Sequence, residues 1–598
     1  MKRRIKNNSV KQIMKVLLIF TAFVLLLASC SEDFLEPKAL SFHNPDDVFT
    51  DIEGFESGLV TVRKDIKTDF YGNRNPLQLE YVSSDFGYGI ALEDWTIITP
   101  STGSFFPIIP LFSDIYRYIK NANVIISRID DIQWDNQEDR NRILGTAMFY
   151  RAWWYYQLIT TYGDVPYIGY ELKEARLDFY THSRWTILEK IITDVEYALE
   201  WLPETSNAGD INKYVALHFL AKLYLANSEF DKAINAAAAV INGPYELMRE
   251  RFGSDAADEN YNVIWDLHRP ENKSIATNKE SIWTVIDRAD APVEAKTFSY
   301  TMRGYHCPWW YTWVLDSEGK NGTIPEGEQY YALGRGNPDV NQSYWFSYDL
   351  WNESGYTWKN TPDLRRSNAC WWEMDEILYN RTTSVDYGKP INTDYLANKY
   401  DSLKLWPMPY YKTFYPHEDD YTGTPYGGNG DSYIFRLAET YLIRAEAYFW
   451  KGETDLAAAD INVVRERSNA VPISAGDVSI DFIADERLRE LSHEEFRHSE
   501  LVRIANIMAK NGINGYSLDN LHENNWWYDR VMKYNTWYRF GLVGPTRYQT
   551  EPKYIYWPIN VNIITTNTKG VINQNKGYEG AENNVTPLTE IIDEGRSY

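Results

Sequence analysis

The spacing of apolar and polar residues predicts helices over most of the chain, most clearly from Arg436 to Arg467. One face of the first helix in this stretch is apolar, through Leu437, Tyr441, Ala445 and Tyr448. Gly452 ends that helix and Thr454 begins a second one, so the stretch forms a helical hairpin. The charged residues Arg436, Glu439 and Glu446 are expected elsewhere on the helix surface. A single hairpin cannot bury both of its faces, so it requires neighbours of the same kind.

A second hairpin of the same kind is predicted upstream, from Leu217 to Ile241. When the two stretches are shifted by 224 positions, identical residues coincide: Ala221, Tyr224, Glu229, Asp231 and Ala233 with Ala445, Tyr448, Glu453, Asp455 and Ala457. This register indicates two tetratricopeptide-type repeats of one helical array. Two unrelated alanine-rich hairpins are the alternative interpretation.

Helical patterns also occupy much of the remaining chain. The expected helices are Asp46–Lys67, Leu111–Ile129, Arg140–Tyr162, Arg184–Leu202 and a helix or helix pair over Ile483–Met508. The stretch from 253 to 433 differs, because Gly, Pro and Asn clusters divide it into short strand-like or irregular pieces. We therefore predict a mainly α fold in one domain, 30–598, with a superhelical scaffold over about 40–250 and 431–598 and a loop-rich insertion between them.

Aromatic residues are concentrated in the predicted insertion. They account for fourteen of the sixty residues from 301 to 360, six of them tryptophan, against 15% of the whole chain. A loop-rich segment that carries many large, flat side chains is where a binding site is expected. In contrast, Trp153 to Tyr156 belong to a predicted helix, and their side chains are expected to pack against neighbouring helices. Trp283, in a strand-like run, is expected to be buried.

The first thirty residues predict export and lipid attachment. A basic head precedes an uncharged apolar run from Val16 to Ala28, which is too short to span a bilayer but typical of a signal peptide. Leu27-Ala28-Ser29-Cys30 resembles a lipobox, so residues 1–29 are expected to be removed and Cys30 to be acylated. An ordinary cleaved signal with an incidental cysteine is the alternative. Loss of the six basic leader residues changes the formal charge from −24 to −30, and so acidic a chain is not expected to bind nucleic acid.

An ordered series of motifs resembles the SusD/RagB family of outer-membrane lipoproteins. The motifs are Cys30–Glu36, Asn121–Asn123, Tyr150–Ala152, Tyr162–Pro166, Arg436–Tyr448, Asn462–Arg467, Glu486–Arg503, Trp557-Pro558 and Gln574–Tyr578. The resemblance implies a helical, SusD-like protein without a catalytic site. It also implies that the protein is anchored by lipid to the outer membrane, faces the cell exterior, binds an oligosaccharide and delivers it to a SusC-like TonB-dependent transporter. Some proteins that resemble this family serve peptide transporters, so a peptide ligand is an alternative.

Aromatic side chains are the expected ligand platform. A sugar ring offers a face of C–H groups that packs on a flat ring, and hydroxyls that bond to amides or carboxylates. The candidates are Trp95, Tyr305, Trp309, Trp310, Tyr311, Trp313, Trp345, Trp351 and Trp358. For each of them, a place in the hydrophobic core is the alternative.

The sequence offers no motif for catalysis, a cofactor or a metal: it contains no nucleophile elbow, phosphate loop, dinucleotide fingerprint or Cys-x-x-Cys pair. His493 and His498 are five residues apart, whereas a zincin helix needs four, and both are expected on the surface. Cys307 and Cys370 are predicted to be free thiols. An exported glycoside hydrolase or lyase of the helical-barrel type is the alternative function, because two catalytic carboxylates leave no short signature.

Overall fold

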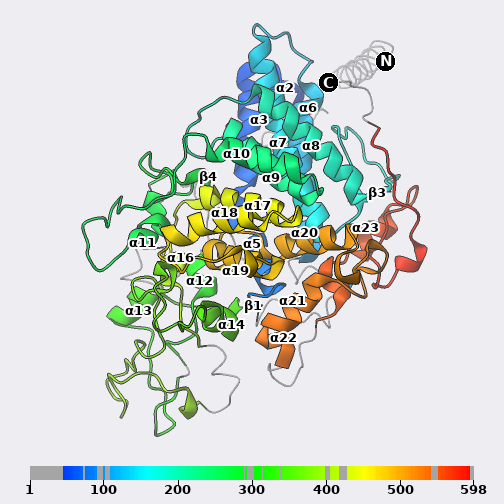
Figure 1. Cartoon of the computed structure of the whole chain (residues 1–598). Helices are drawn as coiled ribbons and strands as arrows, with labels where there is room; N and C mark the ends of the chain where they lie inside the picture. The colour runs from blue at the N-terminus through cyan, green and yellow to red at the C-terminus, as the bar shows by residue number, and fades with distance from the viewer. Residues whose placement is uncertain are drawn as a thin grey trace, which may run out of the picture.

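The structure, a computed structural model, describes residues 45–71, 75–89, 99–101, 108–288, 290–292, 302–312, 314–336, 340–396, 405–415, 427–540 and 550–592. Within these residues the fold is mainly α-helical, and the strands form two-stranded sheets (Figure 1). No helix in this part of the chain combines the length and the apolar character needed to cross a membrane.

The N-terminal part is a stack of helices built around one that is buried along most of its length. Its helices are α2 (Pro45–Val48), α3 (Ile52–Asp65), α4 (Lys67–Phe70), α5 (Pro76–Val82), α6 (Ile108–Arg128), α7 (Gln137–Thr161) and α8 (Arg184–Trp201). Helix α7 packs against α3, α6, α8 and the later helix α20 (Arg497–Lys510). These contacts surround it, so Trp153, Trp154, Tyr155 and Tyr156 are all buried, which confirms their predicted packing.

The two predicted hairpins lie side by side (Figure 1). Helices α9 (Lys213–Ala226) and α10 (Phe230–Ile241) form the first, and α17 (Leu437–Trp450) and α18 (Thr454–Arg467) form the second. Helix α10 packs along α17, where the rings of Phe230 and Trp450 stack with their centroids 6.4 Å apart. Gly452 follows α17 at a φ of +80°, a conformation that suits glycine. The shared register in the sequence therefore corresponds to hairpins that pack on each other.

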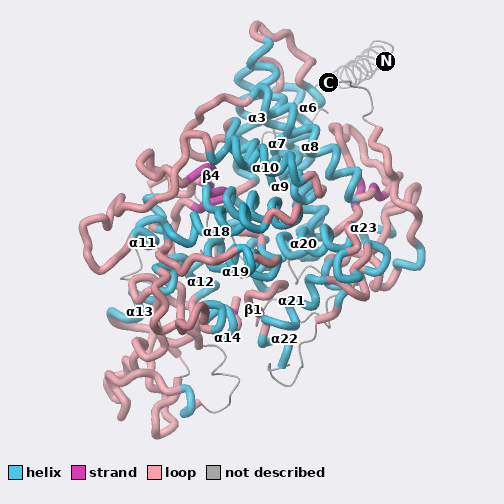
Figure 2. The backbone as a smooth tube through the Cα atoms, viewed as in Figure 1, coloured by secondary structure: helices cyan, strands magenta, loops and turns pink. Residues whose placement is uncertain are grey.

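The stretch between α10 and α17 is rich in loops, as predicted (Figure 2). Its short elements are α11 (Val263–His268), β4 (Ser281–Val285), α12 (Met302–His306), α13 (Glu328–Leu333), β5 (Asn341–Gln342), α14 (Tyr344–Ser347), α16 (Tyr410–Thr413) and β6 (Ser432–Arg436). Strands β4 and β6 pair antiparallel, with Ser281 opposite Arg436. Because β6 leads directly into α17, this pairing ties the stretch to the second hairpin. Trp283 in β4 is 3% exposed, which confirms its predicted burial.

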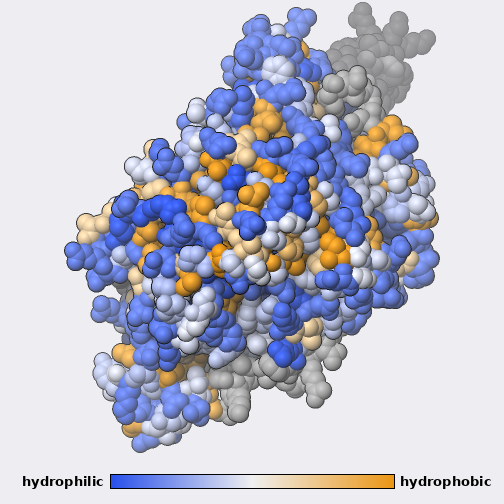
Figure 3. Space-filling view, in the orientation of Figure 1, coloured by the Kyte–Doolittle hydropathy of each residue, from blue (hydrophilic) through white to orange (hydrophobic). Residues whose placement is uncertain are grey.

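The remaining elements are α19 (Ile480–Leu491), α20, α21 (Trp526–Tyr534), α22 (Thr536–Phe540), α23 (Val561–Thr566), the pair β1 (Gly87–Tyr88) with β5, and the pair β2 (Val165–Pro166) with β3 (Thr181–His182). Among them, α19 and α20 lie in the middle of the view in Figure 1, α21 and α22 below them, and α23 and β3 at the right. On the face shown in Figure 3, hydrophobic residues gather over the central helices, and the outer loops are mainly hydrophilic. Cys307 and Cys370 are buried and free, as predicted.

The predicted helix pair over Ile483–Met508 is present as α19 and α20, and many of its charged side chains are buried. Glu490 of α19 pairs with Arg436 at 2.8 Å, with Arg365 at 3.0 Å and with Arg467. All four side chains are at most 2% exposed. One carboxylate of α19 thus joins the insertion, the start of α17 and the end of α18.

The neighbouring residues of α19 extend the same arrangement. Glu486 pairs with Arg365 at 2.8 Å and with Arg465 at 2.6 Å. Burial on its own would raise the pKa of Glu486, but the surrounding guanidinium groups lower that pKa to about 2. On the other side of the helix, Arg487 pairs with Glu439 of α17 at 2.9 Å. We call this set of contacts, centred on Glu486, Arg487 and Glu490, the buried ion-pair network.

Two groups of polar residues lie in the interior of the protein, and the second group contradicts an expectation from the sequence. Arg436, Glu439 and Glu446 are at most 3% exposed and not on the surface, because each pairs with an opposite charge from α19 or α20. His493 and His498 are 5% and 0% exposed, so their predicted surface location was wrong. His498 lies between the carbonyl oxygens of Ser83 and Ile555, within hydrogen-bond distance of both.

Glu80 of α5 is a buried carboxyl group that is held by a serine and not by a cation among the described residues. Its oxygens accept hydrogen bonds from the backbone N–H of Ser499 at 2.6 Å and from the Ser499 hydroxyl at 2.8 Å. Burial raises the pKa of Glu80 to about 8, although the bonds from Ser499 act in the opposite direction. The folded protein therefore holds Glu80 protonated at neutral pH.

The buried ion-pair network predicts the effect of Glu490→Gln. The substitution leaves Arg436, Arg365 and Arg467 short of one buried negative charge, so we expect the free energy of unfolding to fall by about 3–5 kcal/mol. Urea unfolding followed by circular dichroism measures it. Glu466→Gln, at an exposed position of α18, is the matched control and is expected to change stability by less than about 0.5 kcal/mol. Equal stability of the two variants would contradict the assigned role of Glu490.

The raised pKa of Glu80 predicts how stability varies with pH. In the unfolded chain the carboxyl has an ordinary pKa of about 4.5, so its contribution is complete below that pH and is lost as the pH rises through about 8. Glu80→Gln removes this titration. We expect the variant to gain stability relative to the natural protein between pH 5 and pH 8, as measured by urea midpoints across that range. Parallel pH profiles for the two proteins would show that Glu80 is ionised in the fold.

Candidate ligand-binding site

A hollow of about 770 Å³ lies where the insertion meets α22, and we call it the insertion pocket. Its walls come from β5, α14, residues 390–393, residues 405–407 and the first two residues of α22. The pairing of β5 with β1, in which Asn341 lies opposite Tyr88, fixes the position of α14 directly after β5. A short, loop-built wall is thus held against the helical core.

Aromatic rings form one side of the insertion pocket. Tyr344 and Tyr348 are four residues apart, so the helical turn of α14 places them on one face, with ring centroids 4.7 Å apart. Trp358 continues this row, 4.9 Å from Tyr348. Tyr344 is 58% exposed, an unusual position for a large aromatic side chain. Tyr344 therefore exposes its ring beside the hollow, whereas Tyr348 and Trp358 are half-buried.

Two tryptophans and a glutamine lie deeper in the pocket. Trp406 and Trp537 are 5% and 4% exposed. The indole N–H of Trp537 donates to the carbonyl oxygen of Gln342 at 3.3 Å, and the Gln342 amide donates to the Ser347 hydroxyl at 3.0 Å. The indole N–H of Trp406 is buried and has no hydrogen-bond partner among the described residues.

Neutral polar groups complete the lining. They are the amides of Gln342 and Asn392 and the hydroxyls of Ser347, Thr393 and Thr536. None of the described residues that line the pocket carries a carboxylate or a cation. Burial raises the pKa of Tyr348 to about 12, so its phenol stays protonated and can donate a hydrogen bond. Flat aromatic faces beside uncharged donors and acceptors suit a neutral polyhydroxylated ring.

The aromatic residues singled out in the sequence separate into different environments. Trp358 adjoins the insertion pocket through Tyr348. Trp310 and Tyr311 belong to a small core within the insertion, at 0% and 4% exposure, and half-buried Trp309 packs against it. The fully buried rings present no face to a ligand, so the structure does not assemble the predicted platform around them.

Two more of the predicted ligand-binding tryptophans are buried. Trp345 is 8% exposed because its ring packs on Tyr534, 4.3 Å between centroids. Trp351 is 1% exposed in the main core, where its indole N–H donates to the carbonyl of Phe346 at 2.9 Å. Tyr305 lies in α12. Cys30, Trp95 and Trp313 lie outside the described residues.

Sequence reasoning missed most of the pocket. Tyr344 and Tyr348 were not among the predicted ligand-binding residues, whereas the neighbouring Trp345 was. The two tyrosines are four residues apart and so share one face of a helical turn, and Trp345 lies on another face. Trp406 and Trp537 are separated from them by many residues and meet them only in the fold. No pattern within a short stretch of sequence predicts that these residues lie close together.

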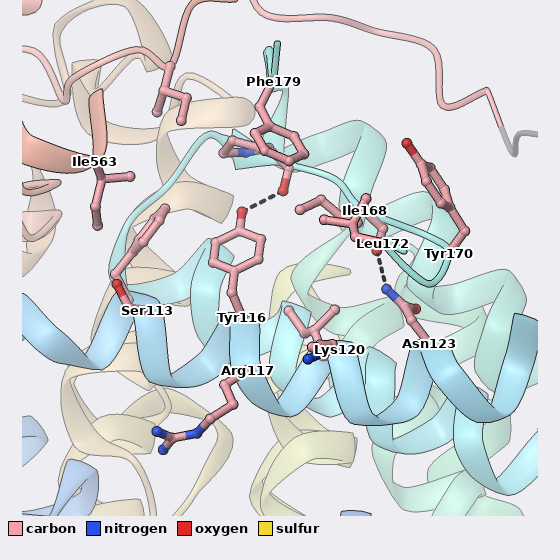
Figure 4. A pocket seen from close by; sticks show the side chains of 14 residues that line it. Ser113, Tyr116, Arg117, Lys120, Asn123, Ile168, Tyr170, Leu172, Phe179 and Ile563 are labelled. Atoms are coloured by element: carbon pink, nitrogen blue, oxygen red, sulfur yellow. Dashed lines mark hydrogen bonds between the residues drawn. The ribbon is translucent and has the colours of Figure 1, made fainter. Parts of the chain in front are cut away.

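A second hollow, of about 400 Å³, has a different chemistry (Figure 4). It lies between α6 and the segment after β2, with Ile563 of α23 at one end. Tyr116 donates to the carbonyl of Pro166 at 2.5 Å, and Asn123 donates to the carbonyl of Ile168 at 2.8 Å. Because these polar groups are engaged with the backbone, the surface left to the hollow is mainly apolar. It fits aliphatic groups better than a sugar.

Comparison with known families places the chain. The model described as "SusD family" matches residues 279–578, about half of the chain. The chain belongs to the SusD family. A second family model, described as "Starch-binding associating with outer membrane", matches residues 90–225. The two matches together include nearly all of α9, the whole second hairpin and most of the stretch between α10 and α17, while α10 lies between them.

Individual SusD-like relatives align over different lengths. A SusD-like protein of Bacteroides ovatus is 22% identical over 568 residues, which cover 90% of this chain and 92% of the relative. The starch-binding protein SusD of Bacteroides thetaiotaomicron is 22% identical over 373 residues, 59% of this chain and 63% of the relative. SusD-like protein P2 of Formosa agariphila is 36% identical over 130 residues, which cover 26% of that protein.

Solved SusD-like structures share the fold. A laminarin-binding SusD-like protein superposes with a TM-score of 0.59 at 19% identity, over 88% of this chain and all of the other. Surface glycan-binding protein A of Bacteroides uniformis gives a TM-score of 0.59 at 18% identity, over 88% of this chain and 99% of the other. The helical, SusD-like fold predicted from the sequence is thereby confirmed.

Proposed function

We propose that this SusD-family protein binds a neutral oligosaccharide in the insertion pocket, without cleaving it. The observation that carries the proposal is exposed Tyr344, with half-buried Tyr348 and Trp358 next to it, beside uncharged amides and hydroxyls. Relatives named for binding starch and laminarin support the ligand class. As in the family resemblance, the protein would be anchored at the outer membrane through Cys30 and would pass its ligand to a SusC-like TonB-dependent transporter.

Binding without hydrolysis is favoured over a glycosidase by the lining of the pocket. Glycoside hydrolysis usually needs two carboxyl groups placed on either side of the scissile bond. The described residues that line the insertion pocket supply none. A peptide ligand, the other alternative, would use its charged termini or backbone, and the lining offers no charged group to the termini. The uncharged aromatic lining suits a sugar better.

The proposal predicts a loss of glycan affinity in Tyr344→Ala. Removal of this exposed ring takes away a stacking face, so we expect about tenfold weaker binding, equivalent to about 1.4 kcal/mol. Isothermal titration of the purified protein with laminarin- and starch-derived oligosaccharides measures the affinity. The double variant Tyr344→Ala/Tyr348→Ala is expected to bind more weakly still. Exposed Tyr344 is not in the core, so the fold is expected to be retained.

Tyr180→Ala is the matched control. Tyr180 is another exposed tyrosine, at 44%, and it lies beside β3 outside the pocket. Its removal is expected to leave the affinity unchanged. Equal affinity of the natural protein and the double variant would exclude the insertion pocket as the glycan site. Release of shortened sugars during the titration would favour the hydrolase alternative, and binding of peptides alone would favour the peptide receptor.

The proposed anchor predicts the fate of Cys30→Ala. Without the thiol no acyl group is attached, and retention at the membrane is lost because each buried methylene contributes about 0.8 kcal/mol. We expect the natural protein, expressed in a Bacteroidetes host, to incorporate an alkynyl fatty acid and to sediment with outer membranes. The variant is expected to do neither. Cys307→Ala, at a buried thiol, controls for labelling of other cysteines. Equal labelling of the Cys30→Ala variant would refute the anchor.

A further inference from the structure

A polar pocket of about 320 Å³ lies at the N-terminus of α8 and shares no lining residue with the insertion pocket. The start of α8 forms one wall, together with Asn506 of α20. Residues 553–556, 573–576 and 584–587 from the C-terminal part form the others. Figure 1 shows this part of the chain, near β3 and α23, at the side of the molecule, whereas α14 lies at its lower end. We call this hollow the α8 pocket.

Arg184 is the feature that sets the α8 pocket apart. The residue is 5% exposed, and its Nη1 donates to the hydroxyl of Tyr556 at 2.6 Å. Its Nε is buried and has no hydrogen-bond partner in the part of the chain that the structure describes. Arg436 and Arg497, which are also buried, each pair with carboxylates. The Arg184 guanidinium forms no such ion pair with a described residue, and its Nη1 bonds to a phenol instead. An unpartnered buried donor of this kind indicates a missing acceptor.

The other charged groups of the pocket leave it positive. Lys576 is exposed, and its ammonium contacts only a carbonyl oxygen, that of Asp519, at 3.3 Å. Lys553 is balanced by Glu551 at 2.8 Å, and His522 lies 3.6 Å from Glu523. The one carboxyl group of the lining is Asp164, whose Oδ1 accepts the backbone N–H of Arg184 at 2.8 Å. Burial raises the pKa of Asp164, whereas the neighbouring charges of Arg184 and Lys576 act in the opposite direction.

Two further features favour an anion in this place. The N-terminus of α8, an eighteen-residue helix, adds the positive end of its dipole. The protein as a whole has a formal charge of −24, whereas this lining sets Arg184 and Lys576 against a single carboxyl group, that of Asp164, so its positive balance is not a product of general composition. Half-buried Trp185 packs on the Arg184 guanidinium, whose Cζ lies 5.0 Å from the centroid of the Trp185 ring.

We propose that the α8 pocket binds an acidic sugar residue through its carboxylate. Tyr556 occupies Nη1 of Arg184, which leaves the edge formed by Nε and Nη2, and two parallel N–H groups along that edge match the two oxygens of a carboxylate. Lys576 adds a second positive charge at the mouth. That the ligand is a sugar rests on the proposed function, whereas that it is an anion rests on Arg184 and Lys576.

The test is isothermal titration of the full mature protein with D-galacturonate, D-galactose and D-galactose 6-sulfate. We expect galacturonate to bind at least tenfold more tightly than galactose and to weaken as salt is added, since the contact is ionic. Arg184→Lys keeps the charge but loses the two-pronged edge, and about tenfold weaker binding is expected. Lys576→Gln, at an exposed position, is expected to weaken binding about threefold and cannot do so by unfolding the core.

Lys320→Gln is the matched control, because Lys320 is exposed and distant from this lining, and it is expected to bind as the natural protein does. Absence of galacturonate binding, or unchanged affinity in both Arg184→Lys and Lys576→Gln, would overturn the proposal. So would tighter binding of the sulfate ester than of the carboxylate. Tyr344→Ala distinguishes the two sites, because this variant is expected to bind galacturonate with unchanged affinity. If the natural protein binds no neutral glycan, the proposed function fails, but galacturonate is still expected to bind in the α8 pocket.

Discussion

The buried ion-pair network is the constraint on which the rest of the structure depends. Ions are costly to remove from water, and a buried pair offsets that cost only when each charge meets its partner in good geometry. Glu490 meets Arg436 from the start of α17, Arg467 from the end of α18 and Arg365 from the insertion. None of these segments can be displaced without leaving a charge unpaired in the interior. The network therefore specifies one relative placement of hairpin, insertion and C-terminal helices.

This placement explains how a loop-rich insertion can carry a shaped pocket. Ordering a loop costs conformational entropy, but the insertion is held at several points by contacts with the helical scaffold. Arg436 and Glu280 join β6 and the residue before β4 at 2.6 Å, and β5 pairs with β1. The short turn of α14 lies directly beyond β5, so Tyr344 and Tyr348 inherit their position from the helical core. Tyr344 can then remain exposed without collapsing into the interior.

Much of the fold was predictable because it repeats a local signal. The hairpins, the helix over Arg140–Tyr162 and the helix pair over Ile483–Met508 are each encoded by periodicity within a short window. The sequence misled where burial and polarity disagree. Glu439 and His498 are polar residues that local rules assign to the surface, and only their distant partners make their burial possible. Such partners lie on other helices, beyond the reach of any window.

The candidate site was harder to predict for a related reason. Clustering of tryptophan located the insertion, but a tryptophan is as well suited to a core as to a sugar, and Trp310 and Trp351 took the first role. What distinguishes a platform is exposure of a ring face beside a hollow, and that is decided by tertiary packing. Trp345 and Tyr344 are adjacent in sequence, yet α14 turns one toward Tyr534 and the other toward solvent. Within a single helical turn, the larger ring therefore packs into the wall of the pocket and the smaller ring stays exposed beside it.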